Sequence, residues 1–270
     1  MEFSPWRNKA RQVRVAAGFA GAGLAALLPL AALAEITNGG LIGPGLRLRP
    51  AYDGASAQRT ELVPVIRYLG QPFFVRSTQG VLEGGVRTEL ATGLHAGAQL
   101  AYEPGRQAGD SAFLKSRQIA DIRRGVSVGL QMEWDEKLGP MPVTLLARLR
   151  RHADSGLGAQ ADLRLSAGVF QGGPFSAGVF TQATWADATS TNARYGIGPP
   201  QSAASGLPVY QPGGGLLHAS GGLLWSFDLG PQWVALGSLE VRRLRGDAAA
   251  SPLVQRRWSG YTSVGLAYRF

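Results

Sequence analysis

The chain ends in Ser263-Val264-Gly265-Leu266-Ala267-Tyr268-Arg269-Phe270, a stretch that alternates between two kinds of side chain. Val264, Leu266, Tyr268 and Phe270 are apolar or aromatic, whereas the residues between them are small or charged. Successive side chains of a β-strand point to opposite faces, so this pattern predicts a strand with one apolar face and one polar face. Such a strand, with aromatic residues at its end, is typical of barrels that cross membranes.

The same two-residue rhythm recurs along the chain in segments separated by Gly, Pro and Asp. A soluble β-sandwich would also alternate, but here aromatic residues gather near segment ends and the polar face is rich in Gly, Ala and Ser, which favours a barrel. We expect an all-β fold, a closed antiparallel transmembrane β-barrel of twelve strands, with ten as the alternative. The expected strands are 41–53, 59–69, 72–78, 80–87, 92–103, 122–135, 142–152, 157–170, 174–187, 215–228, 231–245 and 258–270. Whether 72–87 forms one strand or two stays open, since each half is short for a membrane crossing.

Residues 1–34 have the features of a secretory signal peptide. Arg7, Lys9, Arg11 and Arg14 precede an apolar run, and a small-residue exit places cleavage between Ala34 and Glu35. A retained N-terminal anchor is the alternative. After this segment no run of about 20 apolar residues remains, so a closed barrel is the expected way to cross a bilayer. We therefore expect residues 35–270 to form a barrel exported to the outer membrane of a Gram-negative cell.

Short turns and long loops alternate between the expected strands. The long loops are 104–121, 188–214 and 246–257, and in outer-membrane barrels such loops face outward while short turns face the periplasm. Tyr268 and Phe270 are the expected assembly signal for the barrel-assembly machinery. Lipid and lipopolysaccharide would surround the barrel. The formal net charge is +9, but the arginines are scattered along the strands, so we expect no nucleic-acid partner.

Charged residues recur on the polar faces, where they would point into the lumen. A charge buried there must be paired or hydrated, so these residues either form ion pairs that plug the barrel, which we favour, or line a charge-selective pore. The expected lumenal charges are Arg47, Arg49, Glu103, Glu133, Arg148, Arg150, Asp162, Arg164, Glu240 and Arg242, together with Glu61 and Arg67.

The sequence offers little catalytic chemistry. It has no cysteine and only three histidines, His95, His152 and His218, which fall on different expected strands. Structural zinc sites need four nitrogen or sulfur ligands, and no Gly-x-Ser-x-Gly motif occurs. We expect no catalytic residue, no metal site and no cofactor, and we predict that the protein is not an enzyme.

The most distinctive stretches are Gly246-Asp-Ala-Ala-Ala-Ser-Pro-Leu-Val254 and Ser205-Gly-Leu-Pro-Val-Tyr210. With 43–54, 62–68, 73–80, 184–187, 195–198 and 268–270, the chain resembles the MltA-interacting protein family of outer-membrane proteins, also called MipA/OmpV. The resemblance implies a non-enzymatic barrel that scaffolds peptidoglycan-remodelling enzymes, joining a lytic transglycosylase to a murein synthase in the periplasm. A small-solute or ion channel is the alternative function.

Overall fold

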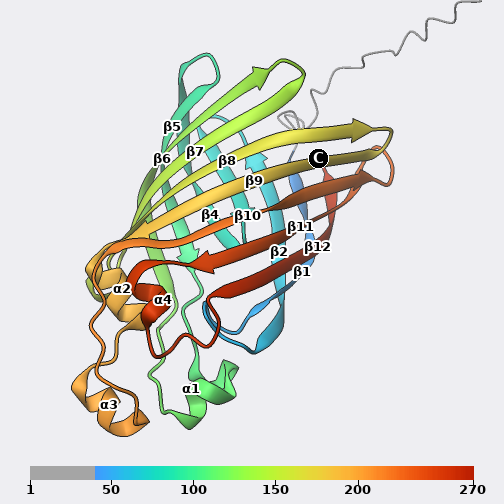
Figure 1. Ribbon diagram of the computed structural model, residues 1–270. Coiled ribbons are helices and arrows are strands. Elements are labelled where there is room, and N and C mark those ends of the chain that lie inside the picture. The colour runs from blue at the N-terminus through green and yellow to red at the C-terminus, as the bar shows by residue number, and fades with distance from the viewer. Residues whose placement is uncertain (1–39) are drawn as a thin grey trace, which may run out of the picture.

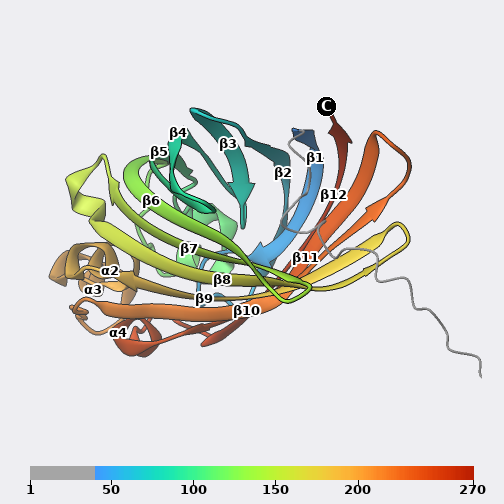
Figure 2. The same cartoon turned by 90° about the horizontal axis from the view of Figure 1, so that it is seen from above.

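The computed structural model describes residues 40–270, which form twelve antiparallel strands in a closed barrel (Figures 1 and 2). The predicted barrel of twelve strands is therefore confirmed, and residues 72–87 contribute two strands. The signal peptide and its cleavage between Ala34 and Glu35 lie outside the described residues. The strands are β1 (Leu41–Pro50), β2 (Gln58–Leu69), β3 (Phe73–Thr78), β4 (Val81–Ala91), β5 (Leu94–Glu103), β6 (Gly125–Leu138), β7 (Met141–His152), β8 (Ala159–Gly172), β9 (Phe175–Ala186), β10 (Gly215–Asp228), β11 (Trp233–Leu244) and β12 (Trp258–Arg269).

The barrel closes where the first strand pairs with the last. β1 and β12 run antiparallel from Leu41 opposite Arg269 to Leu48 opposite Thr262. The N–H of Gly40 donates to the carbonyl of Phe270 at 2.8 Å, and the N–H of Phe270 donates back at 3.0 Å. This pairing removes the two free edges that an open sheet of twelve strands would expose.

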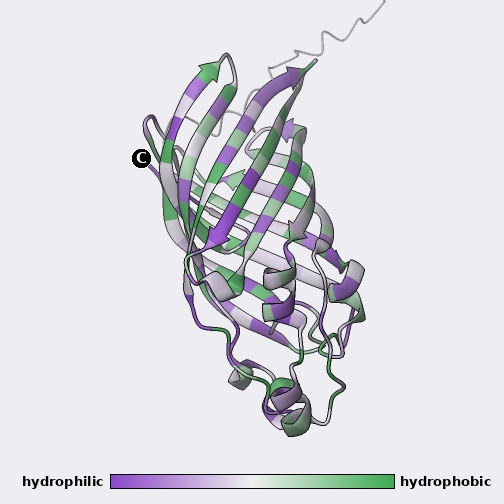
Figure 3. Cartoon of the chain, turned by 90° about the vertical axis from the view of Figure 1, so that its left-hand side faces the viewer, coloured by the Kyte–Doolittle hydropathy of each residue, from purple (hydrophilic) through white to green (hydrophobic). Residues whose placement is uncertain are grey.

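The outer surface of the barrel is apolar and the inner surface is polar. Along β6, Leu130 and Met132 are 63% and 50% exposed, whereas Gln131 and Glu133 are 6% and 5% exposed. The alternation runs along the strands as changing hydropathy in Figure 3. So much exposed apolar surface is unfavourable in water and fits contact with lipid chains. Within residues 40–270, no helix is both long enough and apolar enough to cross a membrane.

Aromatic side chains lie exposed near both ends of the barrel, as interfacial girdles require. Phe73, Trp233 and Phe270 lie at one end, and Trp185 and Trp258 lie at the other. Two further aromatics near the ends of expected strands do not lie on the outer surface. Phe74 is 1% exposed and points inward, and Tyr52 is buried in a loop because β1 ends at Pro50, not at residue 53.

The two ends of the barrel differ in their connections. At the end that we call the turn end, short turns join the strands and the C-terminus lies beside Gly40. At the opposite end, which we call the loop end, the longer connections carry all the helices (Figure 1). These are η1 (Ala108–Asp110), α1 (Ala112–Ser116), η2 (Ser155–Leu157), α2 (Ala188–Tyr195), α3 (Pro199–Ser205) and α4 (Gly246–Ala250).

The loops at the loop end pack into a small apolar core of their own, which we call the loop cap. Leu114, Ile197 and Leu253 are almost fully buried there and come from three different connections. The hydroxyl of Tyr52, in the β1–β2 connection, donates to the carbonyl of Leu253 at 2.8 Å. The cap is therefore a folded part of the protein that holds the loop end in shape.

Because the outward side chains of the strands face lipid, a charged substitution should destabilise the barrel more in the middle of a strand than in a loop. Leu165, in the middle of β8, and Val209, in a connection at the loop end, have similar exposure, 44% and 49%. Leu165→Arg should destabilise the barrel by about 2–4 kcal/mol because the guanidinium enters the hydrocarbon layer. Val209→Arg should change stability by less than about 0.5 kcal/mol because it stays in water. Denaturant unfolding from lipid vesicles measures both, and equal costs would contradict this contact with lipid.

Candidate functional site: the charged lumen

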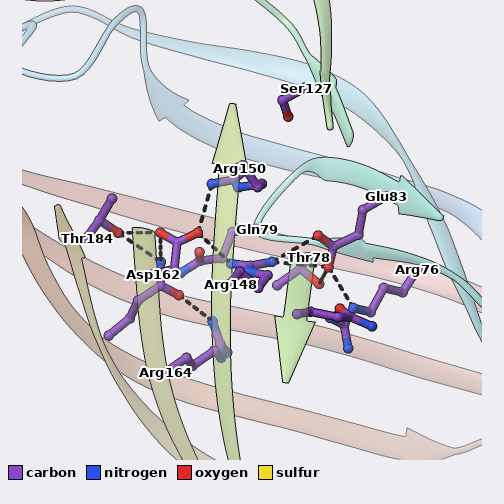
Figure 4. Close-up of polar contacts among 12 residues, drawn as sticks. Arg76, Thr78, Gln79, Glu83, Ser127, Arg148, Arg150, Asp162, Arg164 and Thr184 are labelled. Atoms are coloured by element: carbon purple, nitrogen blue, oxygen red, sulfur yellow. Dashed lines mark hydrogen bonds and ion pairs between the residues drawn. The ribbon is translucent and has the colours of Figure 1, made fainter. Parts of the chain in front are cut away.

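A network of ion pairs crosses the inside of the barrel, and the carboxylate of Glu83 lies near its centre (Figure 4). The Glu83 side chain, on β4, is fully buried. Arg76 Nε, on β3, donates to Glu83 Oε1 at 2.6 Å, and Arg148 Nη1, on β7, lies 3.1 Å from both carboxylate oxygens. Charge-assisted contacts of this kind offset the cost of removing the carboxylate from water.

Asp162, on β8, continues the network on the other side of Arg148. Its Oδ2 accepts from Arg150 Nη2 at 2.8 Å and lies 3.4 Å from Arg148 Nη2. The hydroxyl of Thr184 donates to Oδ1 at 2.7 Å. Arg150 also reaches Glu103, on β5, at 3.3 Å. Because β3 and β8 are five places apart in the ring of twelve strands, the chain of contacts from Arg76 to Asp162 crosses the lumen.

Glu133, on β6, anchors the network toward the turn end. Arg76 Nη1 donates to Glu133 Oε2 at 2.5 Å, and Arg87 Nη1 donates to Oε1 at 3.2 Å. Arg76 Nη2 also donates to the side-chain oxygen of Gln131 at 2.7 Å. All three donating groups of the Arg76 guanidinium are therefore used, which fixes its plane across the barrel.

A second group of charges lies toward the loop end. Arg242, on β11, contacts Asp53 at 3.1 Å and Glu240 at 3.0 Å, and its guanidinium lies 4.4 Å from the ring centre of Tyr261. The Tyr261 hydroxyl donates to Asp53. Nearby, Arg49 and Arg47 both contact Glu61, at 2.7 and 3.9 Å.

Arg164 differs from the other charges predicted for the lumen. It is buried, but its guanidinium stacks 3.8 Å from the ring centre of Phe180 and contacts Ser166 at 3.3 Å and Gln182 at 3.5 Å. Within the part of the chain that the structure describes, it forms no ion pair with a carboxylate. A cation–π contact thus takes the place of a salt bridge.

Between the network and the loop cap lies a cavity of about 210 Å³, which we call the loop-end cavity. Its walls include Arg148, Arg150 and Asp162 from the network and Tyr195 from α2. Two buried imidazole nitrogens, Nε2 of His152 and Nδ1 of His218, face no hydrogen-bond partner among residues 40–270. The cavity is therefore polar and charged, unlike the apolar core of the loop cap.

Burial beside this cavity shifts the pKa of two groups that lie in the loops. Burial raises the pKa of the Tyr52 hydroxyl to about 12, although Arg106 acts in the opposite direction. Burial also lowers the pKa of the Arg106 guanidinium, partly opposed by Tyr195 and Tyr52. Since an arginine stays protonated even when its pKa falls, Arg106 carries its charge beside the cavity at neutral pH.

The three histidines lie on three strands, His95 on β5, His152 on β7 and His218 on β10. His95 Nδ1 lies 4.0 Å from Asp135, toward the turn end, whereas the other two border the loop-end cavity. Residues 40–270 contain no group of three or more potential metal-ligating side chains.

The expected assembly signal lies at the seam of the barrel. Tyr268 packs edge-on against Trp233 with ring centres 5.4 Å apart, and Phe270 is exposed at the turn end. The backbone of Phe270 is held by both hydrogen bonds to Gly40.

The sequence analysis missed the central pair Arg76 and Glu83. The two residues face each other across the β3–β4 hairpin, whose two-residue turn is Gln79 and Gly80, both with positive φ as a tight hairpin turn requires. The expected strands, 72–78 and 80–87, left a single residue between them and so set Arg76 opposite Leu82; the two-residue turn shifts the register by one and brings Arg76 opposite Glu83. The alternation of apolar and polar residues is also broken in β3, because Phe74 is apolar yet points inward.

The most distinctive sequence stretches build the loop cap. The Tyr210 hydroxyl donates to the carbonyl of Asp247 at 2.8 Å, and the Asp247 carboxylate accepts from the N–H of Gly213 at 2.7 Å. The Ser251 hydroxyl donates to the carbonyl of Tyr195 at 2.6 Å. These residues therefore tie the long β9–β10 connection to the β11–β12 connection.

The model of the family described as MltA-interacting protein MipA matches residues 42–270, which include every strand and the loop cap. The chain belongs to this family. The MltA-interacting proteins of Escherichia coli (strain K12) and Shigella flexneri are each 26% identical to it over 214 residues, covering 77% of this chain and 81% of the relative.

Among solved structures, an outer-membrane channel from Pseudomonas putida F1 has a TM-score of 0.43 with 9% identity, covering 86% of this chain and 96% of that one. A bacterial polysaccharide outer-membrane secretin has a TM-score of 0.42 with 8% identity, covering 87% and 100%. The MipA family match and the apolar outer surface together make this chain an outer-membrane β-barrel protein.

The network predicts that removing its central carboxylate lowers the stability of the barrel. Glu83→Gln should destabilise the MipA-family barrel by about 3 kcal/mol, since two buried guanidinium groups lose a partner while Arg76 keeps Glu133 and Arg148 keeps Asp162. Glu136→Gln, at an exposed position of β6, should cost less than about 1 kcal/mol. The temperature at which unboiled protein loses its folded mobility in SDS gels reports both. A Glu83 variant as stable as wild type would show that the pairs do not hold the lumen together.

Proposed function

We propose that this MipA-family protein is a non-enzymatic scaffold whose barrel is closed to solutes and whose turn end binds peptidoglycan-remodelling enzymes. The observation that carries the closed barrel is the chain of contacts from Arg76 through Glu83 and Arg148 to Asp162, which crosses the lumen. Family membership supports the scaffold role, because the relatives in Escherichia coli and Shigella flexneri are named for an interaction with MltA.

The charged side chains of the central network pair with each other, which supports a structural role for them. Arg148 and Arg150 share Asp162, and Arg76 is shared by Glu83 and Glu133. A general base or nucleophile needs a free acid–base group directed at an open site, and a salt-bridged carboxylate of this kind is held ionised and occupied. This arrangement favours a scaffold over an enzyme.

The orientation in the membrane follows from the connections. Outer-membrane barrels place short turns in the periplasm and longer loops outside the cell. With the signal peptide removed after Ala34, the turn end would face the periplasm and the loop cap would face outward among the lipopolysaccharide. Assembly into the membrane would use the terminal Tyr268 and Phe270, recognised by the barrel-assembly machinery.

The turn end offers an apolar contact surface for a periplasmic partner. Leu90 and Leu138 lie at the turn-end termini of β4 and β6, Leu229 lies in the β10–β11 turn, and each is between 58% and 59% exposed. Exposed leucines in or beside short, well-ordered turns are suitable anchors for a protein interface. We place the enzyme-binding site on these three residues, which we call the turn-end leucines.

A small-solute or ion channel is the competing function. Planar-bilayer recordings separate the two, because a barrel closed by its ion-pair network would pass no current whereas a channel requires a continuous path for ions. Steady single-channel conductance after verified insertion would favour the channel.

The scaffold role predicts that charges on the turn-end leucines weaken enzyme binding. The double variant Leu138→Glu and Leu229→Glu should reduce co-purification of lytic transglycosylases and murein synthases from detergent-solubilised membranes by about tenfold, as expected when interface anchors worth about 1.4 kcal/mol or more are lost. Val209→Glu, at an exposed apolar position of the loop end, is the matched control and should leave co-purification unchanged. Undiminished recovery with the double variant would move the binding site elsewhere, and no recovery with the wild type would contradict the scaffold role.

A further inference from the structure

The wall of the barrel is incomplete next to β2 at the loop end. β2 pairs with β3 at only three positions, Arg67 with Arg76, Tyr68 with Val75 and Leu69 with Phe74, all near the turn end. Residues 58–65 of β2 extend beyond this pairing, and in the described chain no strand is paired to that edge of them. Pro64 lies in this stretch and has no N–H to leave unpaired, a common feature of unpaired strand edges.

The β3–β4 hairpin does not fill this part of the wall because its tip turns into the lumen. Gln79 Nε2 donates to Glu240 Oε2 at 3.1 Å, on β11, and residues 78–81 border the loop-end cavity. At the loop end of β2, Arg59 forms an ion pair with Asp110 of η1, which lies in the β5–β6 connection. Backbone pairing is therefore missing from the wall between the loop-end half of β2 and the hairpin tip, and we call this unpaired part of the wall the side window.

The loop-end cavity reaches the side window. Glu61 of β2, Gln79 of the hairpin tip and Glu103 at the end of β5 all line it. Just outside, Leu62 of β2 is 80% exposed, the highest exposure among the large apolar residues of the barrel. A molecule in the window would therefore have lipid chains on one side and a charged cavity on the other.

The cavity carries more positive than negative charge. Eight arginines and four carboxylates line it. Five of the arginines pair with carboxylates, whereas Arg106, Arg123 and Arg194 form no ion pair within residues 40–270. Arg106 instead donates to the backbone carbonyl of Arg194 at 2.6 Å, and the Arg194 guanidinium donates to the Ser190 hydroxyl at 2.9 Å.

Buried polar atoms in the same cavity also lack partners. Nε2 of His152 and Nδ1 of His218 belong to side chains that are more than nine-tenths buried, and neither nitrogen has a hydrogen-bond partner in the described part of the chain. Neither nitrogen has appreciable exposed surface, and Nε2 of His152 lies against Gly125 of β6, so neither is open to a molecule in the cavity. The excess of arginine over carboxylate fits an anionic ligand.

We propose that the loop-end cavity binds the phosphate of an anionic lipid headgroup, with Arg106, Arg123 and Arg194 as the phosphate-binding residues. Arginine suits this role because its planar fork donates two parallel hydrogen bonds to a phosphate. The side window favours a membrane lipid as the source, with its acyl chains left in the bilayer beside Leu62. A soluble sugar phosphate that enters from the loop end would supply the same chemistry.

The test compares two lipids that differ only in phosphate. The full mature barrel in detergent is mixed with diphosphoryl lipid A or with fully dephosphorylated lipid A, and bound lipid is quantified by native mass spectrometry. Wild-type protein should retain the phosphorylated form at least tenfold better. The triple variant Arg106→Gln, Arg123→Gln and Arg194→Gln should lose that preference.

Matched controls separate charge loss at the site from a general effect. The control triple variant Arg124→Gln, Arg151→Gln and Arg256→Gln removes three exposed arginines outside the cavity and should bind like wild type. Because Arg106 and Arg194 also hold loop backbone and side-chain groups, Arg123→Gln alone is the variant least disruptive to folding and should weaken binding severalfold. Folded mobility of unboiled protein in SDS gels confirms that each variant is intact.

The outcomes separate the proposal from its alternatives. Equal retention of the two lipids by wild type, with no binding of glucose 1-phosphate by calorimetry, would overturn the phosphate site, and so would equal losses in the two triple variants. Arginine-dependent binding of glucose 1-phosphate without lipid A binding would support the phosphate site with a soluble source. These results do not depend on the turn-end leucines, so the proposed scaffold role can fail or stand separately.

Discussion

Every backbone amide inside a bilayer must find its hydrogen-bond partner within the protein, and the pairing of β1 with β12 is what satisfies this requirement here. With the sheet closed, alternate side chains are forced either toward lipid or toward the lumen. The lipid side favours apolar groups, so the charged residues in the middle of the strands are directed inward. The crowded charges of the lumen therefore follow from closure of the sheet.

Charges that share a narrow lumen must neutralise each other, and the distances show how they do so. Arg76 and Arg148 share Glu83, and Arg148 and Arg150 share Asp162, so each cation of the network lies between carboxylates. The same contacts that offset desolvation also join opposite walls of the barrel. The loop-end cavity lies between these contacts and the loop cap, and arginines outnumber carboxylates in its walls.

The sequence predicted the strands well because lipid on one side and charge on the other give every strand the same strong pattern. Arg148, Arg150, Asp162 and Glu133 could be placed on the inner face in this way. What could not be predicted depends on contacts across the barrel: which arginine meets which carboxylate, and the inward turn of the hairpin tip at Gln79. Phe74 departs from the pattern because an inward aromatic ring lies 5.4 Å from the guanidinium of Arg76, a contact that alternation alone does not reveal.

The absence of cysteine from the sequence allows the central claim, that alternate residues face lipid and lumen, to be measured directly. Single cysteines at each position from 126 to 133 of β6 would be spin-labelled, and their collision rates with oxygen, which partitions into lipid, would be recorded in vesicles. The account predicts a two-residue period, with high rates at Val126, Val128, Leu130 and Met132 and low rates at positions 127, 129, 131 and 133. Uniform rates along the strand, or the opposite phase, would contradict it.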